Sequence, residues 1–181
     1  MKAVGYAQSL EISDAKSLED IELPQPTPES RDLLVKVSAI SVNPVDTKVR
    51  MRAAPPEGEY KVLGYDAVGE VVEVGSDVSA YKVGDKVWYA GDITRPGTNS
   101  EYHLVDERIA GKAPQSLSDA EAAAVPLTAI TAWELLFDRL AIPQGDQAAN
   151  VRLLVIGAAG GVGSILVQLA SQLTNATVIG T

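Results

Sequence analysis

Residues 151–173 read VRLLVIGAAGGVGSILVQLASQL and join three patterns in a fixed order. The segment begins with an apolar β-type run at 153–156 and ends with a helical pattern from about residue 164 to 173. Between these patterns lie four glycines within seven residues: Gly157, Gly160, Gly161 and Gly163. Glycines between a strand and a helix permit a tight turn and bring backbone N–H groups close to a pyrophosphate. The segment therefore predicts a strand, a turn and a helix that hold a dinucleotide.

The glycine pattern is a variant of the dinucleotide fingerprint. Gly160 and Gly163 occupy its second and third positions, whereas Ala158 stands at the first. The unpaired donors at the start of a helix favour phosphate, which makes the whole turn a candidate cofactor site: Ala159, Gly160, Gly161, Val162 and Gly163. The alternative is a glycine-lined turn of any α/β protein. The residue that selects NAD or NADP follows the next strand, expected at 176–181, so it lies at or beyond Thr181.

Composition excludes several classes of function. Lys and Arg number 15 against 24 Asp and Glu, a formal charge of −9, which argues against a nucleic-acid partner. The chain has no cysteine and one histidine, His103, so disulfides, thiolate nucleophiles and cysteine-based zinc sites are excluded. The N-terminus lacks the basic and apolar segments of a secretory signal. We therefore expect a cytoplasmic protein without zinc.

A membrane-inserted tail is the rival interpretation of the C-terminal segment. The 29 residues from 153 to 181 contain no Asp, Glu, Lys or Arg. The most apolar part, 153–170, only reaches the lower limit of about 17–25 residues for a spanning helix. Each glycine there weakens a helix by roughly 1 kcal/mol relative to alanine. We expect no membrane insertion.

Short strands are expected up to about residue 112, and helices after it. Alternating apolar residues predict strands at 31–42 and 67–74. The segment 81–89 carries a Gly-Asp pair between apolar residues, which indicates a hairpin. Ser118 followed by Glu121 has the spacing of a helix capping box, and apolar spacing predicts a further helix over 131–140. The change from β to α/β patterns falls near 113–127.

Several motifs in this order resemble the medium-chain dehydrogenases/reductases, in particular their zinc-independent quinone-oxidoreductase-like branch. The motifs lie at 43–50 (NPVDTKVR), 64–75 (GYDAVGEVVEVG), 81–87 (YKVGDKV), 126–133 (PLTAITAW) and the glycine turn. The resemblance implies a mixed β and α/β fold. It places a GroES-like β-barrel catalytic domain at 1–125 and a partial Rossmann domain, truncated after its second strand, at 126–181.

The resemblance also implies an activity and a cofactor. The expected function is NADPH-dependent reduction of a quinone or activated carbonyl by hydride transfer without metal, in a cleft between the two domains. Metal-dependent members hold zinc with Cys and His at the positions of Asn43 and Tyr65, so zinc chemistry does not carry over to this sequence. The alternatives are an enoyl or enone reductase of the same fold and a non-catalytic nucleotide-sensing or scaffold protein.

Asn43 is a candidate catalytic and cofactor-binding residue. Its backbone is held extended because proline follows it, and its amide could orient the nicotinamide or a substrate carbonyl; an Asx turn that stabilises the loop is the alternative. Asp46, in the same loop, is expected to pair with Lys48 or Arg50 and to hold the loop rather than to transfer protons.

Tyr65 is the second candidate catalytic residue, because a phenol can donate to a developing oxyanion. A core aromatic with a satisfied hydroxyl is the alternative. Thr131 either contacts the nicotinamide, as the resemblance suggests, or caps its helix. A nucleophilic triad of Ser100, His103 and Asp106 is rejected, because all three lie in one short strand-like segment.

The length predicts an N-terminal fragment, because the α/β part supplies only two strands and one helix. Two strands make a marginal sheet, and the helix is apolar all round, with Ile165, Leu166, Leu169 and Leu173 along it. We expect residues 153–181 to self-associate, with a homodimer as the expected oligomer, or to be poorly ordered. This chain alone is expected to show little or no NADPH-dependent turnover with its small-molecule substrate.

Overall fold

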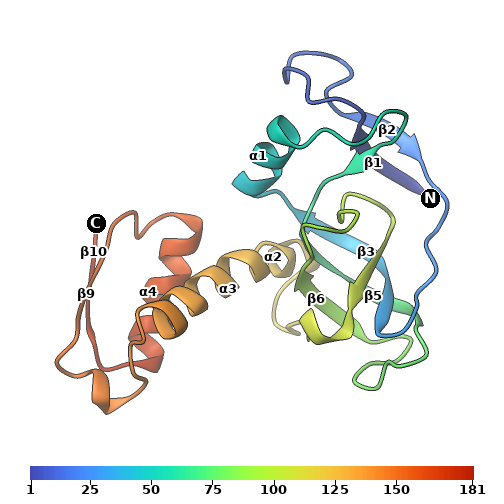
Figure 1. The fold of residues 1–181 in the computed structure, drawn as a ribbon. Helices are drawn as coiled ribbons and strands as arrows, with labels where there is room; N and C mark the ends of the chain where they lie inside the picture. The colour runs from blue at the N-terminus through green and yellow to red at the C-terminus, as the bar shows by residue number, and fades with distance from the viewer. The chain divides into compact units, whose positions relative to one another are not determined.

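Antiparallel strands are the main regular structure of the first 112 residues in the computed structural model, which describes residues 1–181 (Figure 1). The chain divides into a first unit, 1–126, and a second unit, 127–181. The first unit holds eight strands and two short helices, and the second holds a parallel strand pair with helices. The predicted mixed β and α/β fold class is confirmed.

A five-stranded antiparallel sheet forms the centre of the first unit, in the order β7-β3-β5-β6-β8. Its members are β3 (Asp32–Ser41), β5 (Asp66–Val74), β6 (Lys86–Ala90), β7 (Tyr102–Asp106) and β8 (Ala110–Lys112). The predicted strands at 31–42 and 67–74 are thus confirmed as β3 and β5. Their buried side chains form one core, which contains Leu33, Val35, Ala67, Val71, Val87, Tyr89 and Val105.

A smaller three-stranded sheet has the order β2-β1-β4 and carries the N-terminus. It contains β1 (Lys2–Tyr6), β2 (Glu19–Glu22) and β4 (Lys61–Val62), and helix α1 (Pro44–Arg52) follows β3. The Tyr6 hydroxyl donates to the carbonyl oxygen of Ala53 at 2.7 Å. This bond fastens the C-terminal end of α1 to β1. Asn43, a candidate site residue, lies at the other end of α1.

The predicted hairpin at 81–89 is wrong. Residues 81–85 form a turn, with Gly84 at a φ of +90°, and the only strand in this segment is β6. β6 pairs with β5, which lies before the turn, and with β8, which lies twenty residues later. The Gly-Asp pair therefore lies at the end of the long connection from β5 to β6, and not at a tight turn between two strands within 81–89.

The capping box at Ser118 is confirmed. Helix α2 (Asp119–Ala123) begins directly after it: the Glu121 N–H donates to Ser118 Oγ, and the Ser118 N–H donates to Glu121 Oε2 at 2.9 Å. Ala122 and Ala123 of α2 are buried against Val68 of β5. The helix therefore covers part of the five-stranded sheet.

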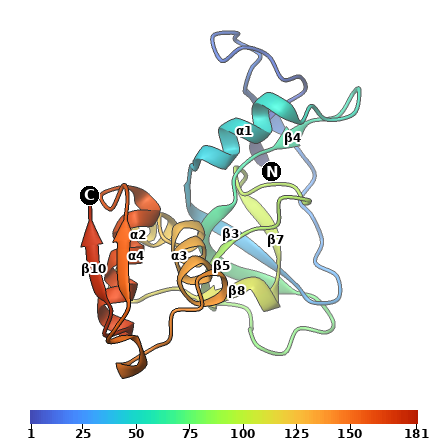
Figure 2. The same ribbon diagram turned by 60° about the vertical axis from the view of Figure 1, so that its left-hand side comes forward.

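The second unit consists of β9 (Arg152–Val155), α4 (Gly161–Leu173) and β10 (Thr177–Gly180), preceded by α3 (Pro126–Trp133) and a π-helical segment (Glu134–Arg139). β9 and β10 are parallel, and α4 lies against one face of them (Figures 1 and 2). The helix expected at 131–140 begins five residues earlier, because proline at position 126 suits a first helical turn that needs no N–H donor. Its second half widens to the π form, in which the Leu140 N–H donates to the Leu135 carbonyl at 3.0 Å.

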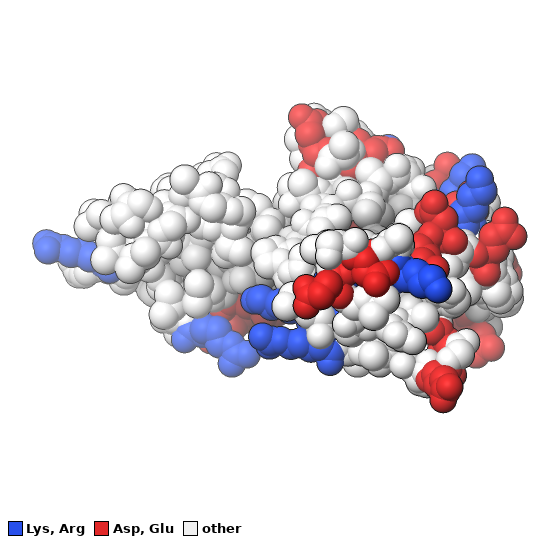
Figure 3. Space-filling model, turned by 90° about the horizontal axis from the view of Figure 1, so that it is seen from above, with Lys and Arg blue, Asp and Glu red and all other residues white.

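The second unit leaves one face of its sheet uncovered. Leu153 and Val155 pack toward α4, whereas Leu154, Ile156 and Ile179 are 59%, 83% and 48% exposed. This unit forms the left part of the surface in Figure 3, which is mostly white and carries few charged side chains. The uncovered apolar surface was expected on the helix, and this expectation is wrong. Leu166 of α4 is buried, and Ile165, Leu169 and Leu173 are half-buried, so the uncovered surface lies on the sheet instead. No helix in the chain has both the length and the apolar character to cross a membrane.

Candidate functional site

Asn43 lies at the N-terminal end of α1 with extended backbone, at φ −122° and ψ 160°. The following proline holds that conformation, and the residue is buried. Its side-chain Nδ2 donates to Asp66 Oδ2 at 2.8 Å, and its backbone N–H donates to Asp46 Oδ2 at 2.7 Å. Asp66 therefore orients the side-chain amide and Asp46 holds the backbone, and the amide keeps one of its two hydrogens for a ligand.

Asp46 joins the two segments that carry the candidate catalytic residues. Its Oδ2 accepts the Asn43 N–H, and its Oδ1 accepts the Gly64 N–H at 2.9 Å. The expected ion pair with Lys48 or Arg50 is not formed, because Arg50 instead donates to the carbonyl oxygen of Leu10 at 2.7 Å. Asp46 holds the loop as predicted, but through backbone N–H groups rather than through a cation.

Tyr65 follows this clamp directly, and its side chain is buried. Burial raises the pKa of its phenol, and the negative charge of Asp46 and the neighbouring Tyr6 raise it further. The phenol is therefore neutral at physiological pH and able to donate. Its hydroxyl makes no hydrogen bond within the protein, so the alternative of a core aromatic with a satisfied hydroxyl does not fit.

Asp66 is a site residue that the sequence analysis missed. It is fully buried at the start of β5, where its carboxylate accepts the Asn43 amide. The signal was an acidic residue at the head of an otherwise apolar strand, since a charge is rarely buried without a partner. Gly64, just before Tyr65, has a φ of +99°, and a Cβ there would lie 2.4 Å from Asn99 Oδ1. Only glycine allows this close approach.

The glycine turn between β9 and α4 is built from backbone contacts. Gly157 adopts a φ of +74°, and its carbonyl accepts the Gly160 N–H at 3.0 Å. The N–H groups of Gly157 and Ala158 both donate to the Thr181 carbonyl at the end of β10, at 3.1 and 3.0 Å. A Cβ on Gly163 would lie 2.2 Å from the Gly157 oxygen, so the helix packs on the turn at a distance that only glycine permits.

The start of α4 presents unpaired backbone donors. Gly160 is its N-cap and has no side chain to accept from the first turn. The N–H groups of Ala159, Gly161, Val162 and Gly163 have no backbone acceptor, whereas that of Gly160 is used inside the turn. A groove of about 380 Å³ lies beside them, lined by Leu135, Leu140, β9 and the turn. Four of the five predicted cofactor residues of the turn thus offer a free N–H donor, and the fifth, Gly160, uses its N–H inside the turn.

Thr131 lies in the middle of α3 and is exposed. Its Oγ1 donates to the Leu127 carbonyl one turn earlier at 2.7 Å. The alternative that it caps its helix is therefore wrong, because the helix begins at Pro126. Thr131 belongs to the second unit together with the glycine turn, whereas Asn43 and Tyr65 belong to the first unit.

The donor set around Asn43 and Tyr65 does not suit zinc, which prefers thiolate and imidazole. The chain has no thiol, and its single imidazole, His103, is buried and hydrogen-bonded on both ring nitrogens. The rejected triad is also ruled out by its contacts: Ser100 Oγ donates to the Tyr102 carbonyl, and Asp106 pairs with Arg108.

Comparisons with known proteins identify the first unit and relatives of the whole chain. Residues 29–115 match the alcohol dehydrogenase GroES-like domain. The chain is 43% identical over 94% of its length to a zinc-type alcohol dehydrogenase-like protein of Staphylococcus epidermidis, and it covers 50% of that protein. It thus spans about half the length of the curated relatives that it matches.

Solved structures with a similar fold also include proteins named as alcohol dehydrogenases and quinone oxidoreductases. A Rhizobium etli protein with the provisional name of zinc-dependent alcohol dehydrogenase protein is 56% identical with a TM-score of 0.91, over 99% of this chain and 52% of that one. The Escherichia coli quinone oxidoreductase complexed with NADPH is 30% identical with a TM-score of 0.78, over the same shares. Proteins with both kinds of name therefore share the fold of this chain.

Proposed function

Because the chain belongs to the medium-chain dehydrogenase/reductase superfamily, we propose that it serves an oxidoreductase that reduces a quinone or activated carbonyl with NADPH, without metal. The observation that carries this proposal is the row of unpaired N–H groups at 161–163, on a turn whose glycines leave no side chain in the way. Such a helix N-terminus stabilises the negative charge of a pyrophosphate.

NADPH, when bound, supplies the hydride. The donors of Ala159, Gly161, Val162 and Gly163 would hold its phosphates, and the exposed Thr131 in the same unit is the proposed contact of the nicotinamide. The four turn residues fit the phosphates of NADPH because their backbone N–H groups have no acceptor within the protein. The phosphates need no metal here.

Asn43 and Tyr65 would act on the substrate. The oxygen of a quinone or carbonyl gains negative charge as hydride is added, and donors aimed at that oxygen stabilise the transition state. Tyr65 supplies a neutral O–H donor, and Asn43 supplies its remaining amide hydrogen. Asp46 and Asp66 keep both residues in place without touching the substrate.

The proposal is tested by NADPH binding and turnover. We expect titration calorimetry to show that NADPH binds the 181-residue chain, with tighter binding than NAD if the 2′-phosphate is recognised. Turnover is measured on the full product of the gene, as loss of NADPH absorbance with a benzoquinone and with an enone. We expect Tyr65→Phe to lower kcat about 100-fold with little change in NADPH affinity.

Each outcome separates the candidate functions. Faster turnover of the quinone supports the proposal, and faster turnover of the enone favours the alkene reductase. NADPH binding with no turnover of any acceptor favours the nucleotide-sensing or scaffold protein. No binding at all contradicts the assignment of the glycine turn.

We also propose that two copies associate through the uncovered sheet face of Leu154, Ile156 and Ile179. Exposed apolar side chains that lie together favour association. Light scattering on the 181-residue chain is expected to give the mass of a dimer, and Ile156→Lys is expected to give a monomer. A wild-type chain that is monomeric at high concentration would contradict this assignment.

A further inference from the structure

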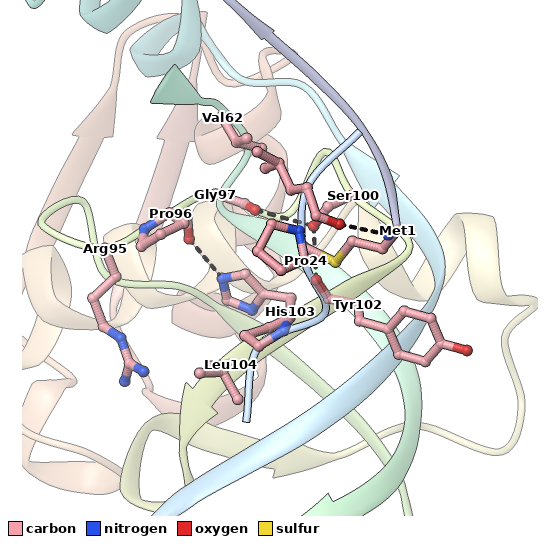
Figure 4. A pocket seen from close by; sticks show the side chains of 12 residues that line it. Met1, Pro24, Val62, Arg95, Pro96, Gly97, Ser100, Tyr102, His103 and Leu104 are labelled. Carbon is pink, nitrogen blue, oxygen red and sulfur yellow. Dashed lines mark hydrogen bonds between the residues drawn. The ribbon is translucent and has the colours of Figure 1, made fainter. Parts of the chain in front are cut away.

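A cavity of about 220 Å³, partly open to solvent, lies in the first unit, and neither Asn43 nor Tyr65 lines it (Figure 4). Its walls come from the N-terminus, the connector after β2, the end of β4, the loop before β7, and β7 itself. The apolar part of the wall includes Met1, Leu23, Pro24, Val62, Pro96 and Leu104. The proposed function uses none of these residues.

The imidazole in the wall has no free hydrogen-bonding atom. His103 Nε2 lies 3.0 Å from the Pro96 carbonyl, and its Nδ1 lies 3.0 Å from the Tyr89 hydroxyl. A carbonyl can only accept, so Nε2 carries the proton, and Nδ1 accepts from the tyrosine. Burial lowers the pKa of His103 to about 4, so the ring is neutral at physiological pH.

Three other polar groups of the wall are also hydrogen-bonded, and the Tyr102 ring points away from the other lining side chains (Figure 4). Arg95 donates through both terminal nitrogens to Asp32, at 2.9 and 2.8 Å. Ser100 Oγ donates to the Tyr102 carbonyl at 2.9 Å, and the ammonium group of Met1 donates to the Leu23 carbonyl at 2.6 Å. The wall therefore offers a ligand little beyond apolar contact.

Prolines make the wall poorer still in donors. Pro24, Pro26 and Pro96 line the cavity and have no backbone N–H. Gly97 adds no side chain to the space, and a Cβ there would lie 2.2 Å from the Leu63 oxygen. A buried water needs two to four polar partners, and this wall has few to give. The cavity is therefore suited to an apolar occupant rather than to water.

We propose that this cavity binds one small, neutral, apolar molecule, such as a substituted benzene ring. An apolar cavity of about 150 Å³ is large enough to hold benzene, and this one is larger. A carboxylate would lose its hydration against this apolar wall, where Arg95 is already neutralised by Asp32 and the imidazole is uncharged. The remaining positive charge, the Met1 ammonium, already donates to the Leu23 carbonyl. A neutral ligand is therefore favoured over an anionic one.

The occupant would contact the segment that leads from β4 to Tyr65. Val62 in the wall accepts the Gly97 N–H at 3.0 Å, and the next bond along, from the Thr98 N–H to the Gly64 carbonyl at 2.9 Å, precedes Tyr65 directly. The proposal itself does not depend on the proposed function, since binding is measured without cofactor or turnover.

The test uses His103 as the reporter, because the chain has only one histidine. The 181-residue chain is titrated with toluene, and in parallel with benzoate, while the imidazole resonances are followed by NMR. We expect saturable shifts with toluene at a Kd on the order of 1 mM or below, and at least tenfold weaker binding of benzoate. Intermolecular NOEs should join toluene to the methyl groups of Val62 and Leu104.

A filling variant and a matched control complete the design. Leu104→Phe places a ring in the cavity and should weaken toluene binding at least tenfold, whereas Leu117→Phe, at an exposed leucine outside the wall, should leave it within twofold. Non-saturable shifts, equal binding of benzoate, or NOEs only to Leu154 and Ile156 would overturn the proposal. The NOEs decide the question in the wild-type chain even if Leu104→Phe fails to fold.

Discussion

Gly163 is the residue on which the geometry of the nucleotide turn depends most. A Cβ there would lie 2.2 Å from the Gly157 oxygen and 2.9 Å from the Ala158 Cα, both of them backbone atoms. A Cβ on Gly160 would meet the same oxygen at 3.3 Å. Gly163→Ala and Gly160→Val therefore form a matched pair: the first changes how the helix packs, and the second places bulk where the phosphates are expected.

The size of each effect follows from these distances. Gly163→Ala forces the turn and the helix apart by about 1 Å, and overpacking of this kind costs about 1–3 kcal/mol. The better helix propensity of alanine returns up to about 1 kcal/mol. We expect the free energy of unfolding of the second unit to fall by about 2 kcal/mol with Gly163→Ala, and by about 1 kcal/mol or less with Gly160→Val, where the N-cap merely loses glycine.

The two tryptophans allow the two units to be observed separately. Trp88 lies in β6 of the first unit, and Trp133 lies in α3 of the second, where it contacts Phe137 edge-on at 4.7 Å. In a Trp88→Phe background, urea unfolding followed by fluorescence reports the second unit alone. NADPH titration of the same proteins should show at least tenfold weaker binding with Gly160→Val, although that variant remains folded.

Two results would refute this reasoning. If Gly163→Ala unfolds at the same urea concentration as the parent, the close packing of α4 on the turn is not real. If Gly160→Val binds NADPH as tightly as the parent, the phosphates do not lie at this turn. A fall in the stability of the first unit, observed through Trp88 in a Trp133→Phe background, would show that the effect is not local.

Three further predictions concern stability and are measured by urea unfolding. Asp46→Asn should lower the free energy of unfolding of the first unit by about 2 kcal/mol, because an amide cannot accept both N–H bonds; an unchanged midpoint would contradict the clamp. The pKa of His103 is about 4 in the folded state and about 6.5 when unfolded, so the unfolded state binds the proton more tightly. The free energy of unfolding should therefore fall by roughly 3 kcal/mol as the pH falls from 6.5 to 4. His103→Gln should remove this part of the pH dependence, and an equal pH dependence in both proteins would contradict the prediction. Ala141 has a φ of +50°, so Ala141→Gly should raise the stability of the second unit by about 1 kcal/mol, and a loss would contradict the strain.

Local signals in the sequence predicted most of the fold. The capping box at Ser118, the alternation in β3 and the glycine turn each act through neighbours within a few residues. The error at 81–89 shows the limit of such signals. A Gly-Asp pair between apolar residues suits a hairpin, but β6 pairs with strands on either side of it in the sequence, and no short-range pattern encodes that choice.

The candidate site was predicted less completely, because its contacts are non-local. Asn43 and Tyr65 could be chosen as single residues, but the carboxylate that orients Asn43 belongs to Asp66, 23 residues away. The partner of Asp46 was expected among the cations of its own helix. It is instead the backbone N–H of Gly64. Every residue except proline has such a group, so the sequence does not indicate which one Asp46 contacts.

The order of strands in the first unit has a consequence for synthesis on the ribosome. β3 lies between β5 and β7, and its pairing with β7 joins Asp32 to Asp106. β1 likewise needs the Asn99 carbonyl to accept the Val4 N–H. At about 5–20 residues per second, the N-terminal strands emerge several seconds before their last partners. During that interval their apolar faces are open to chaperones, and the first unit completes its sheet only after β7 and then β8 have left the exit tunnel.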